Sequence, residues 1–251
     1  MVADFVTIEK GLGPEGRIAV VRFDRGDGIN ALSPEAMRQL TQAARSFEDD
    51  GNTSVVVLTG GPRAFSAGFD LKDPEGRSRK SMDLGSLRRH LKLGPRLSRA
   101  WQEMEQITIG AIEGFCIGGG VALAVALDFR VMARDAHLRV PEIGLGMNMS
   151  WQSIPRMLHL MGPARTKQAV ILADQRISAA EAYEVGPGGG GRRSGHGFRR
   201  CDDAGHKGGS AAAVVGRHDQ ADRQSSRARA RRSRQPHGRR PVRAGEPDRG
   251  S

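Results

Sequence analysis

The sequence lacks several features that would assign it to a large class of proteins. No stretch is apolar over the roughly 18 residues that a membrane-spanning helix requires. The N-terminus, MVADFVTIEK, has no basic segment followed by an apolar one, as a secretory signal would have. We therefore expect a soluble, cytoplasmic protein. The two cysteines, Cys116 and Cys201, cannot form a disulfide framework and do not have the spacing of a metal site, so we expect free thiols.

Common catalytic motifs are missing as well. The sequence contains neither the Gly-x-Ser-x-Gly motif of a serine nucleophile nor a phosphate-binding P-loop. His90, His137 and His159 have no mutual spacing that suggests a metal site or a catalytic triad. We expect no bound metal and place these histidines on the surface or in a satisfied core.

The positive charge is concentrated at one end of the chain. The formal net charge is +11, but residues 1–184 carry 23 Lys and Arg against 22 Asp and Glu, whereas residues 185–251 carry 16 against 6. A basic tail can bind nucleic acid through phosphates. Stacking on bases needs aromatic side chains, however, and Phe198 is the only one in this tail. We do not expect a nucleic-acid partner.

The tail also differs in pattern from the rest of the chain. Residues 185–251 show no sustained helical or strand period, and their few large apolar residues cannot offset the entropy of ordering the backbone. We therefore divide the chain into a folded core, residues 1–184, and a disordered tail, residues 185–251. The tail consists of residues that GC-rich codons yield out of frame, so we hypothesise a frameshifted C-terminus, which gene sequencing would test.

Residues 1–184 alternate strand-like and helix-like segments, which is typical of an α/β fold. Paired strands are expected at residues 5–10 (FVTIEK) and 17–23 (RIAVVRF), and a strand covered on both faces at 54–60 (SVVVLTG). Ser33 is a suitable N-cap before Pro34, so a helix should begin there. The apolar stripe of this helix consists of Met37, Leu40, Ala44 and Phe47. Further strands are expected in ITIGAIEGF and around FRVMA.

Two segments place exposed backbone amides beside small residues. The first is residues 64–71 (AFSAGFDL), and the second is residues 114–128 (GFCIGGGVALAVALD), where three glycines precede an apolar helix. Glycine lets the backbone approach a ligand, and the first amides of a helix have no partner within it. Two such amides that converge on one oxygen form an oxyanion hole. Either segment alone is more typical of tight helix–strand packing, so the interpretation depends on both.

Together and in this order, these segments resemble the crotonase family of enoyl-CoA hydratases and isomerases. The resemblance covers nearly all of residues 5–184 and includes INALS, FSAGFDL, GFCIGGG and PEIGLG. It implies a crotonase-like spiral of ββα repeats, a homotrimer or a dimer of trimers, and an acyl-CoA thioester substrate. Coenzyme A is then part of the substrate, and no separate cofactor is expected.

The resemblance also implies which residues form the site. The backbone amides of Phe69 and Gly119 would donate to the thioester oxygen, and Glu142 would be the acid–base residue. The residues implied to contact the substrate are Ala31, Ala67, Gly68, Phe69, Asp70, Leu71, Lys72, Gly118 and Gly119.

One position departs from the family's pattern. Family hydratases pair two glutamates to activate water; Glu142 matches the second, but Ala122 stands where the first would be. A single carboxylate can still move a proton from one carbon to another, so double-bond isomerisation, weak hydration, decarboxylation and C–C cleavage all stay open. Ala122 also favours an alternative, a non-catalytic CoA-binding or scaffold protein of the same fold.

Other charged residues have simpler interpretations. Asp128, at the end of an apolar helix, is expected to be a structural hydrogen-bond or salt-bridge partner, and Asp70 to cap or begin a helix. Glu113 is expected in a turn or on the surface. A basic group in one helix is expected to be a solvated face that could touch CoA phosphates: Arg88, Arg89, Lys92 and Arg96.

Overall fold

The computed structural model describes residues 4–13, 15–173, 175–185 and 198–200. All of them lie within one compact unit, Met1–Arg217, and a second unit, His218–Ser251, lies outside the described residues. The expectation of a disordered or frameshifted tail at residues 185–251 therefore falls almost wholly outside the described residues, as does Cys201. The exceptions are Val185, which ends a helix, and a short strand at Phe198–Arg200.

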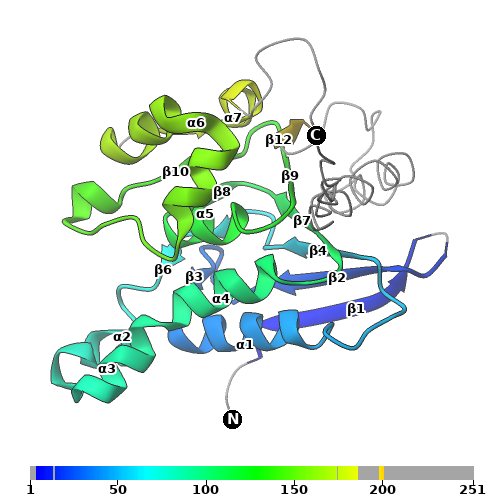
Figure 1. Ribbon diagram of the computed structural model, residues 1–251, viewed down its shortest axis with the longest axis horizontal. Coiled ribbons are helices and arrows are strands. Elements are labelled where there is room, and N and C mark those ends of the chain that lie inside the picture. Colours follow the sequence, from blue (N-terminus) through cyan, green and yellow to red (C-terminus); the bar gives the residue numbers. More distant parts are fainter. Residues whose placement is uncertain (1–3, 14, 174, 186–197, 201–251) are drawn as a thin grey trace, which may run out of the picture. The chain divides into compact units, whose positions relative to one another are not determined.

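The largest sheet has six strands, one antiparallel pair followed by parallel neighbours (Figure 1). In order across the sheet these are β1 (Val6–Leu12), β2 (Ile18–Phe23), β4 (Val55–Thr59), β7 (Ile107–Ile112), β9 (Phe129–Met132) and β12 (Phe198–Arg200). Every residue of β4 is buried, as its continuous apolar run predicted. Parallel strands of this kind need cover on both faces.

Two smaller sheets complete the repeating plan. One contains, in order, β11 (Ile177–Ser178), β10 (His137–Arg139), β8 (Phe115–Ile117) and β5 (Ala64–Ser66); the other pairs β3 (Ala31–Leu32) with β6 (Gly68–Phe69). Three times in succession, a strand of the large sheet is followed by a strand of the four-stranded sheet: β4 by β5, β7 by β8, and β9 by β10. This repetition confirms the expected α/β spiral of ββα units.

Helices follow these strand pairs. They are α1 (Pro34–Arg45), α2 (Pro74–Arg77), α3 (Leu84–Leu91), α4 (Leu93–Gln102), α5 (Gly119–Ala124), α6 (Ser153–Ile171) and α7 (Ala179–Val185), with 3-10 turns η1 (Ser78–Ser81) and η2 (Glu142–Leu145). None of the described helices is both long and apolar enough to cross a membrane.

Helix α1 begins where the sequence predicted. The Ser33 hydroxyl accepts a hydrogen bond from the Ala36 amide at 3.1 Å, and Pro34 is the first helical residue. The predicted stripe extended too far, because the helix ends at Arg45 and Phe47 lies in the turn beyond it. Phe47 is nevertheless fully buried, so its apolar character reflects the core and not the helix period.

Helices α1 and α4 pack side by side against the sheet (Figure 1). Trp101 of α4 is completely buried, and its indole N–H donates to the Leu40 carbonyl of α1 at 3.1 Å. This bond satisfies the one polar atom of a large apolar side chain. It fixes the position of α4, whose opposite end lies near the candidate site.

The C-terminal end of α5 is held by a buried guanidinium. Arg130 is 0% exposed, and its Nη1 donates to the carbonyls of Leu127 at 2.7 Å and Ala124 at 3.2 Å, while Nη2 donates to that of Asp128 at 3.1 Å. Burial lowers the pKa of Arg130 to about 10, and the side chain stays charged at neutral pH. The Asp128 carboxylate accepts from the Thr108 amide and hydroxyl, which confirms its structural role.

Candidate active site

The two glycine-containing segments meet in the structure. Gly68 has a φ of 84°, and a methyl group on it would lie 2.6 Å from the Ile117 carbonyl oxygen and 2.9 Å from the Gly119 nitrogen. A methyl group on Gly119 would lie 3.2 Å from the Phe69 nitrogen. Glycine is required at position 68 for both its backbone conformation and this close approach. The amides of Phe69 and Gly119 are therefore neighbours, although they are 50 positions apart in the sequence.

The Phe69 amide faces away from the strand that pairs with β6. The next amide along the chain, that of Asp70, donates to the Leu32 carbonyl of β3 at 3.1 Å. The Ser66 hydroxyl holds the Gly68 amide at 3.0 Å. Because successive amides of a strand point in opposite directions, that of Phe69 points toward α5.

The Gly119 amide is at the start of a helix. It is the first residue of α5, and the residue before it, Gly118, has no side chain to cap the helix. The first amides of a helix have no carbonyl partner within the helix. Phe69 and Gly119 thus present two main-chain donors in the same small region, and both residues are partly exposed.

The Glu142 carboxyl group lies beside these donors. Glu142 begins η2, and a methyl group on Gly118 would lie 2.8 Å from Glu142 Oε1. The other carboxyl oxygen, Oε2, is buried and has no hydrogen-bond partner among the described residues. Burial raises the pKa of Glu142, because the charged form loses hydration. A carboxyl group with a raised pKa can both release and accept a proton nearer neutral pH.

The structure brings no second carboxylate to this place from position 122. Ala122 lies within α5 and is 1% exposed, and its amide donates to the Gly118 carbonyl at 3.0 Å. The described residues contain no group of three His, Cys, Asp or Glu side chains that could hold a metal ion. The chemistry available at this position is therefore proton transfer by one carboxyl group next to two backbone donors.

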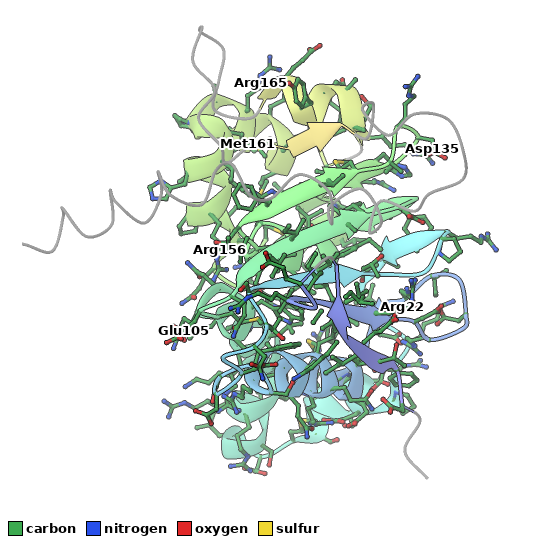
Figure 2. All side chains as sticks on the ribbon, turned by 90° about the vertical axis from the view of Figure 1, so that its right-hand side faces the viewer. Arg22, Glu105, Asp135, Arg156, Met161 and Arg165 are labelled. Carbon is green, nitrogen blue, oxygen red and sulfur yellow. The ribbon has the colours of Figure 1, made fainter. Side chains whose placement is uncertain are left out.

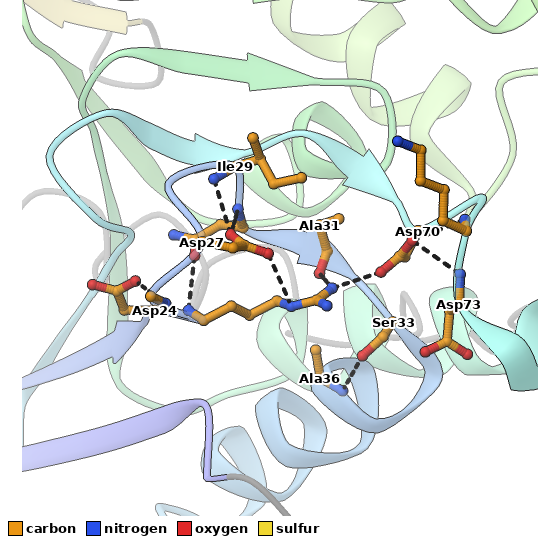
Figure 3. Close-up of polar contacts among 12 residues, drawn as sticks. Asp24, Asp27, Ile29, Ala31, Ser33, Ala36, Asp70 and Asp73 are labelled. Atoms are coloured by element: carbon orange, nitrogen blue, oxygen red, sulfur yellow. Dashed lines mark hydrogen bonds and ion pairs between the residues drawn. The ribbon is translucent and has the colours of Figure 1, made fainter.

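An arginine that the sequence did not single out fixes the strand carrying Phe69. Arg25 Nη1 donates to the Ala31 carbonyl at 2.8 Å and to Asp70 Oδ2 at 2.7 Å (Figure 3). Asp70 Oδ1 accepts from the amides of Lys72 at 2.9 Å and Asp73 at 3.1 Å. Burial pushes the pKa of Asp70 upward, but the Arg25 hydrogen bond and these amides lower it overall.

The Asp70 carboxyl group is fully engaged within the protein, whereas the residues after it are exposed. Both Asp70 carboxyl oxygens are engaged within the protein, and α2 is capped by Asp73, so Asp70 does not cap a helix itself. Leu71 is 52% exposed, and the Lys72 side chain is exposed as well. Arg88, Arg89, Lys92 and Arg96 are exposed as expected, but they do not share one helix, because α3 ends at Leu91 and Arg96 belongs to α4.

Two further residues near the site were not singled out from the sequence. Asn30 is buried with a φ of 48°, and its side-chain amide donates to the carbonyls of Phe23 at 2.9 Å and Ala64 at 3.1 Å. Trp151 has a φ of 58°, and its indole packs on Gly119. An Asn that adopts a left-handed conformation before a strand could have been suspected from its residue type, whereas nothing marks Trp151.

Comparisons with known proteins show the family of the chain. A family model described as "Enoyl-CoA hydratase/isomerase" matches residues 13–187. The chain is 31% identical to crotonyl-CoA hydratase of Syntrophomonas wolfei, over 74% of this chain and 68% of the relative. It is 32% identical to short-chain-enoyl-CoA hydratase of Clostridium acetobutylicum, over 70% of this chain and 65% of that relative.

Solved structures give the same result. The crystal structure of enoyl-CoA hydratase from Bacillus anthracis matches with a TM-score of 0.64 and 29% identity, covering 73% of this chain and 68% of that one. The matched part of the chain thus spans about two thirds of the length of its relatives. The fold, the motifs and these matches show that the chain belongs to the enoyl-CoA hydratase/isomerase family.

Proposed function

We propose that the chain is an enzyme that binds an enoyl-CoA thioester and stabilises its enolate. The amides of Phe69 and Gly119 would donate to the thioester oxygen, and Glu142 would transfer the proton. The observation that carries this proposal is the meeting of the three groups, with Gly119 against Phe69 and Gly118 against Glu142. An enolate carries its negative charge on oxygen, and one preorganised donor to such an oxygen is worth about 3–4 kcal/mol.

The proposed chemistry needs only groups of this chain and the substrate. The Glu142 carboxylate removes a proton from a carbon of the acyl group, and the electrons of the broken C–H bond pass into the thioester, whose oxygen becomes the enolate. Glu142 then returns the proton to a carbon two positions away, and the double bond shifts. No electrons are gained or lost, so no oxidant is required.

Isomerisation and hydration are both possible outcomes of this enolate. Hydration by a pair of carboxylates requires a second acidic group, and position 122 is a buried alanine. The relatives named crotonyl-CoA hydratase and short-chain-enoyl-CoA hydratase support activity on enoyl-CoA. We therefore propose isomerisation as the main reaction and hydration by the single carboxyl group as a slower one.

The substrate contacts follow from the same geometry. The segment that contains Ala67, Gly68 and Phe69 borders the two donors, and Gly118 borders Glu142. Ala31 and Asp70 would contribute by holding this segment in position, because Arg25 donates to the Ala31 carbonyl and to one Asp70 oxygen. The exposed side chains of Leu71 and Lys72 would meet the outer part of coenzyme A.

A turnover panel with one active-site variant tests the function. Trans-2-, cis-3- and trans-3-enoyl-CoA of several lengths would be supplied to the full chain, to Glu142→Gln and to Glu48→Gln. Glu48 is an exposed glutamate outside the site, so its variant is the matched control. We expect Glu142→Gln to lower turnover about 10²–10⁴-fold, the usual contribution of a general acid–base group, and the control to keep full activity.

The same panel separates the enzyme from the alternative favoured by Ala122. A non-catalytic CoA-binding protein would bind acyl-CoA in calorimetry, yet show no turnover that depends on Glu142. The assembly is a separate proposal: we infer a homotrimer or a dimer of trimers, as the family resemblance implies. Sedimentation analysis of the full chain would contradict it by showing a monomer at micromolar concentration.

A further inference from the structure

The indole ring of Trp151 is inserted between two helices next to the proposed oxyanion hole. A methyl group on Gly94, in α4, would lie 1.9 Å from Trp151 Cε2 and 2.2 Å from Nε1. A methyl group on Gly119, in α5, would lie 2.8 Å from Cη2 and 3.0 Å from Cζ3. These distances place the ring directly on the backbone of α4 at the buried Gly94, while its benzene edge reaches α5. Only glycine at both positions leaves room for it.

The backbone is shaped to hold the ring there. Trp151 and Gln152 have φ angles of 58° and 59°, a left-handed conformation that such side chains rarely adopt. Arg156, labelled in Figure 2, donates from Nη1 to the Trp151 carbonyl at 2.8 Å and from Nε to Gln102 Oε1, at the end of α4, at 3.0 Å. One arginine thus ties the turn that carries Trp151 to the helix on which the ring rests.

The ring borders the place where the acyl group would react. A methyl group on Gly119 would touch both the Phe69 nitrogen, at 3.2 Å, and the edge of the Trp151 ring. Glu142 touches the preceding residue, Gly118. An acyl group whose oxygen is bound by Phe69 and Gly119 therefore has the indole beside it as well as the carboxyl group.

We propose that Trp151 is the specificity-determining residue of this site and limits the length of the acyl chain. The proposal rests on the proposed function. The indole fills space between the donors and Gly94, space that a longer acyl chain would otherwise enter. Its large, rigid, apolar ring suits short acyl groups lying against its edge, and removing it would open a channel toward α4.

Chain-length profiles of two variants test this role. We would measure kcat/KM for the isomerisation of four-carbon and ten-carbon 3-enoyl-CoA with the full chain, Trp151→Ala and Trp151→Phe. The ratio of ten-carbon to four-carbon activity should rise at least about 10-fold in Trp151→Ala, because each methylene in an apolar pocket changes kcat/KM by about 10-fold or more. Trp151→Phe should give a smaller rise. Leu158→Ala, which truncates a partly exposed leucine of α6, is the matched control and should keep the original ratio.

Fluorescence gives a second measurement that does not depend on folding of the alanine variant. The chain has two tryptophans, and Trp101 is fully buried with its N–H bonded to Leu40. Butyryl-CoA, which is saturated and is not turned over, should change the tryptophan emission of the full chain, and this change should be lost in Trp151→Phe.

The outcomes separate the inference from the proposed function. An unchanged chain-length ratio in an active Trp151→Ala protein would overturn the inference and leave the enzyme assignment standing. Heat of butyryl-CoA binding without a change in emission would likewise overturn the placement of Trp151. Absence of both binding heat and turnover with any enoyl-CoA would overturn the proposed function itself.

Discussion

The carboxyl group of Glu142 lies directly against Gly118, so close that a single added methyl group would stand 2.8 Å from Oε1. Gly118 also has a φ of 53°, a conformation that strains any residue with a side chain. This glycine therefore has two functions. It lets the chain turn into α5, and it leaves room for the Glu142 carboxyl group beside the helix start.

Replacing this glycine should damage the site more than the fold. In Gly118→Ala, we expect turnover of enoyl-CoA to fall about 10²-fold, since displacement of a reacting group by about 1 Å has that effect. The free energy of unfolding should fall by about 1–3 kcal/mol because of the strained backbone. Gly51→Ala is the control, because Gly51 has a negative φ and open space around it. Full activity of Gly118→Ala would contradict the contact with Glu142.

The partly buried carboxyl group of Glu142 should make stability depend on pH. Its pKa in the folded chain lies above the ordinary value of 4.5, because burial disfavours the charged form. Folding then becomes less favourable as the pH rises from the unfolded-state pKa through the folded-state pKa. Glu142→Gln removes this cost, so the variant should be more stable than the unmodified chain at pH 8, and the difference should shrink below about pH 4.5.

Urea unfolding of both proteins at the two pH values would measure this effect. The Glu48→Gln variant provides the baseline for an exposed glutamate and should show no comparable gain. A stability difference that grows as the pH falls has the wrong sign and would contradict the burial of Glu142.

The pair of Arg25 and Asp70 should contribute to stability and to substrate binding. Its charged hydrogen bond measures 2.7 Å, and the side chains are only 21% and 12% exposed. A double-mutant cycle with Arg25→Met and Asp70→Asn should give a coupling energy of about 1.5–3 kcal/mol, typical of hydrogen bonds to charged groups. KM should rise more than kcat falls in Arg25→Met, since the loop after Phe69 loses an anchor.

A matched exposed pair gives the comparison for this cycle. Arg99 and Glu103 lie 3.9 Å apart with side chains 58% and 70% exposed, and their coupling should be about 0–0.5 kcal/mol. Equal coupling in the two pairs would show that the partial burial of Arg25 and Asp70 has no energetic consequence.

Elements that depend on their own local sequence could be predicted. The run of β-branched residues in β4 could only be a strand covered on both faces, and Ser33 with Pro34 marks a helix start whatever lies around it. The glycines at 68 and 118–119 likewise indicated a close backbone approach. The structural role of Asp128 was predicted from the apolar run before it, although the helix in that run ends earlier, at Ala124.

Features that depend on distant residues were not predictable. Arg25 meets Asp70 across 45 positions, and nothing near Arg25 indicates that partner. The Trp151 indole fits only because Gly94 and Gly119 have no side chains. The left-handed φ of Trp151 is also one that tryptophan rarely adopts. Phe47 was assigned to α1 because its spacing fits the helix, although burial in the core explains it as well.

Helix α5 is short, and it has close contacts at both ends. Its six residues span only about 9 Å, too short a helix to persist without support. The Gly119 amide lies at its start, in the candidate site. Beyond its other end, the Arg130 guanidinium donates to the carbonyls of Ala124 and Leu127. In the proposed site, the position of the reacting oxygen therefore depends partly on a cation at the other end of the helix. A defect at Arg130 would then impair the chemistry although Arg130 does not contact the substrate.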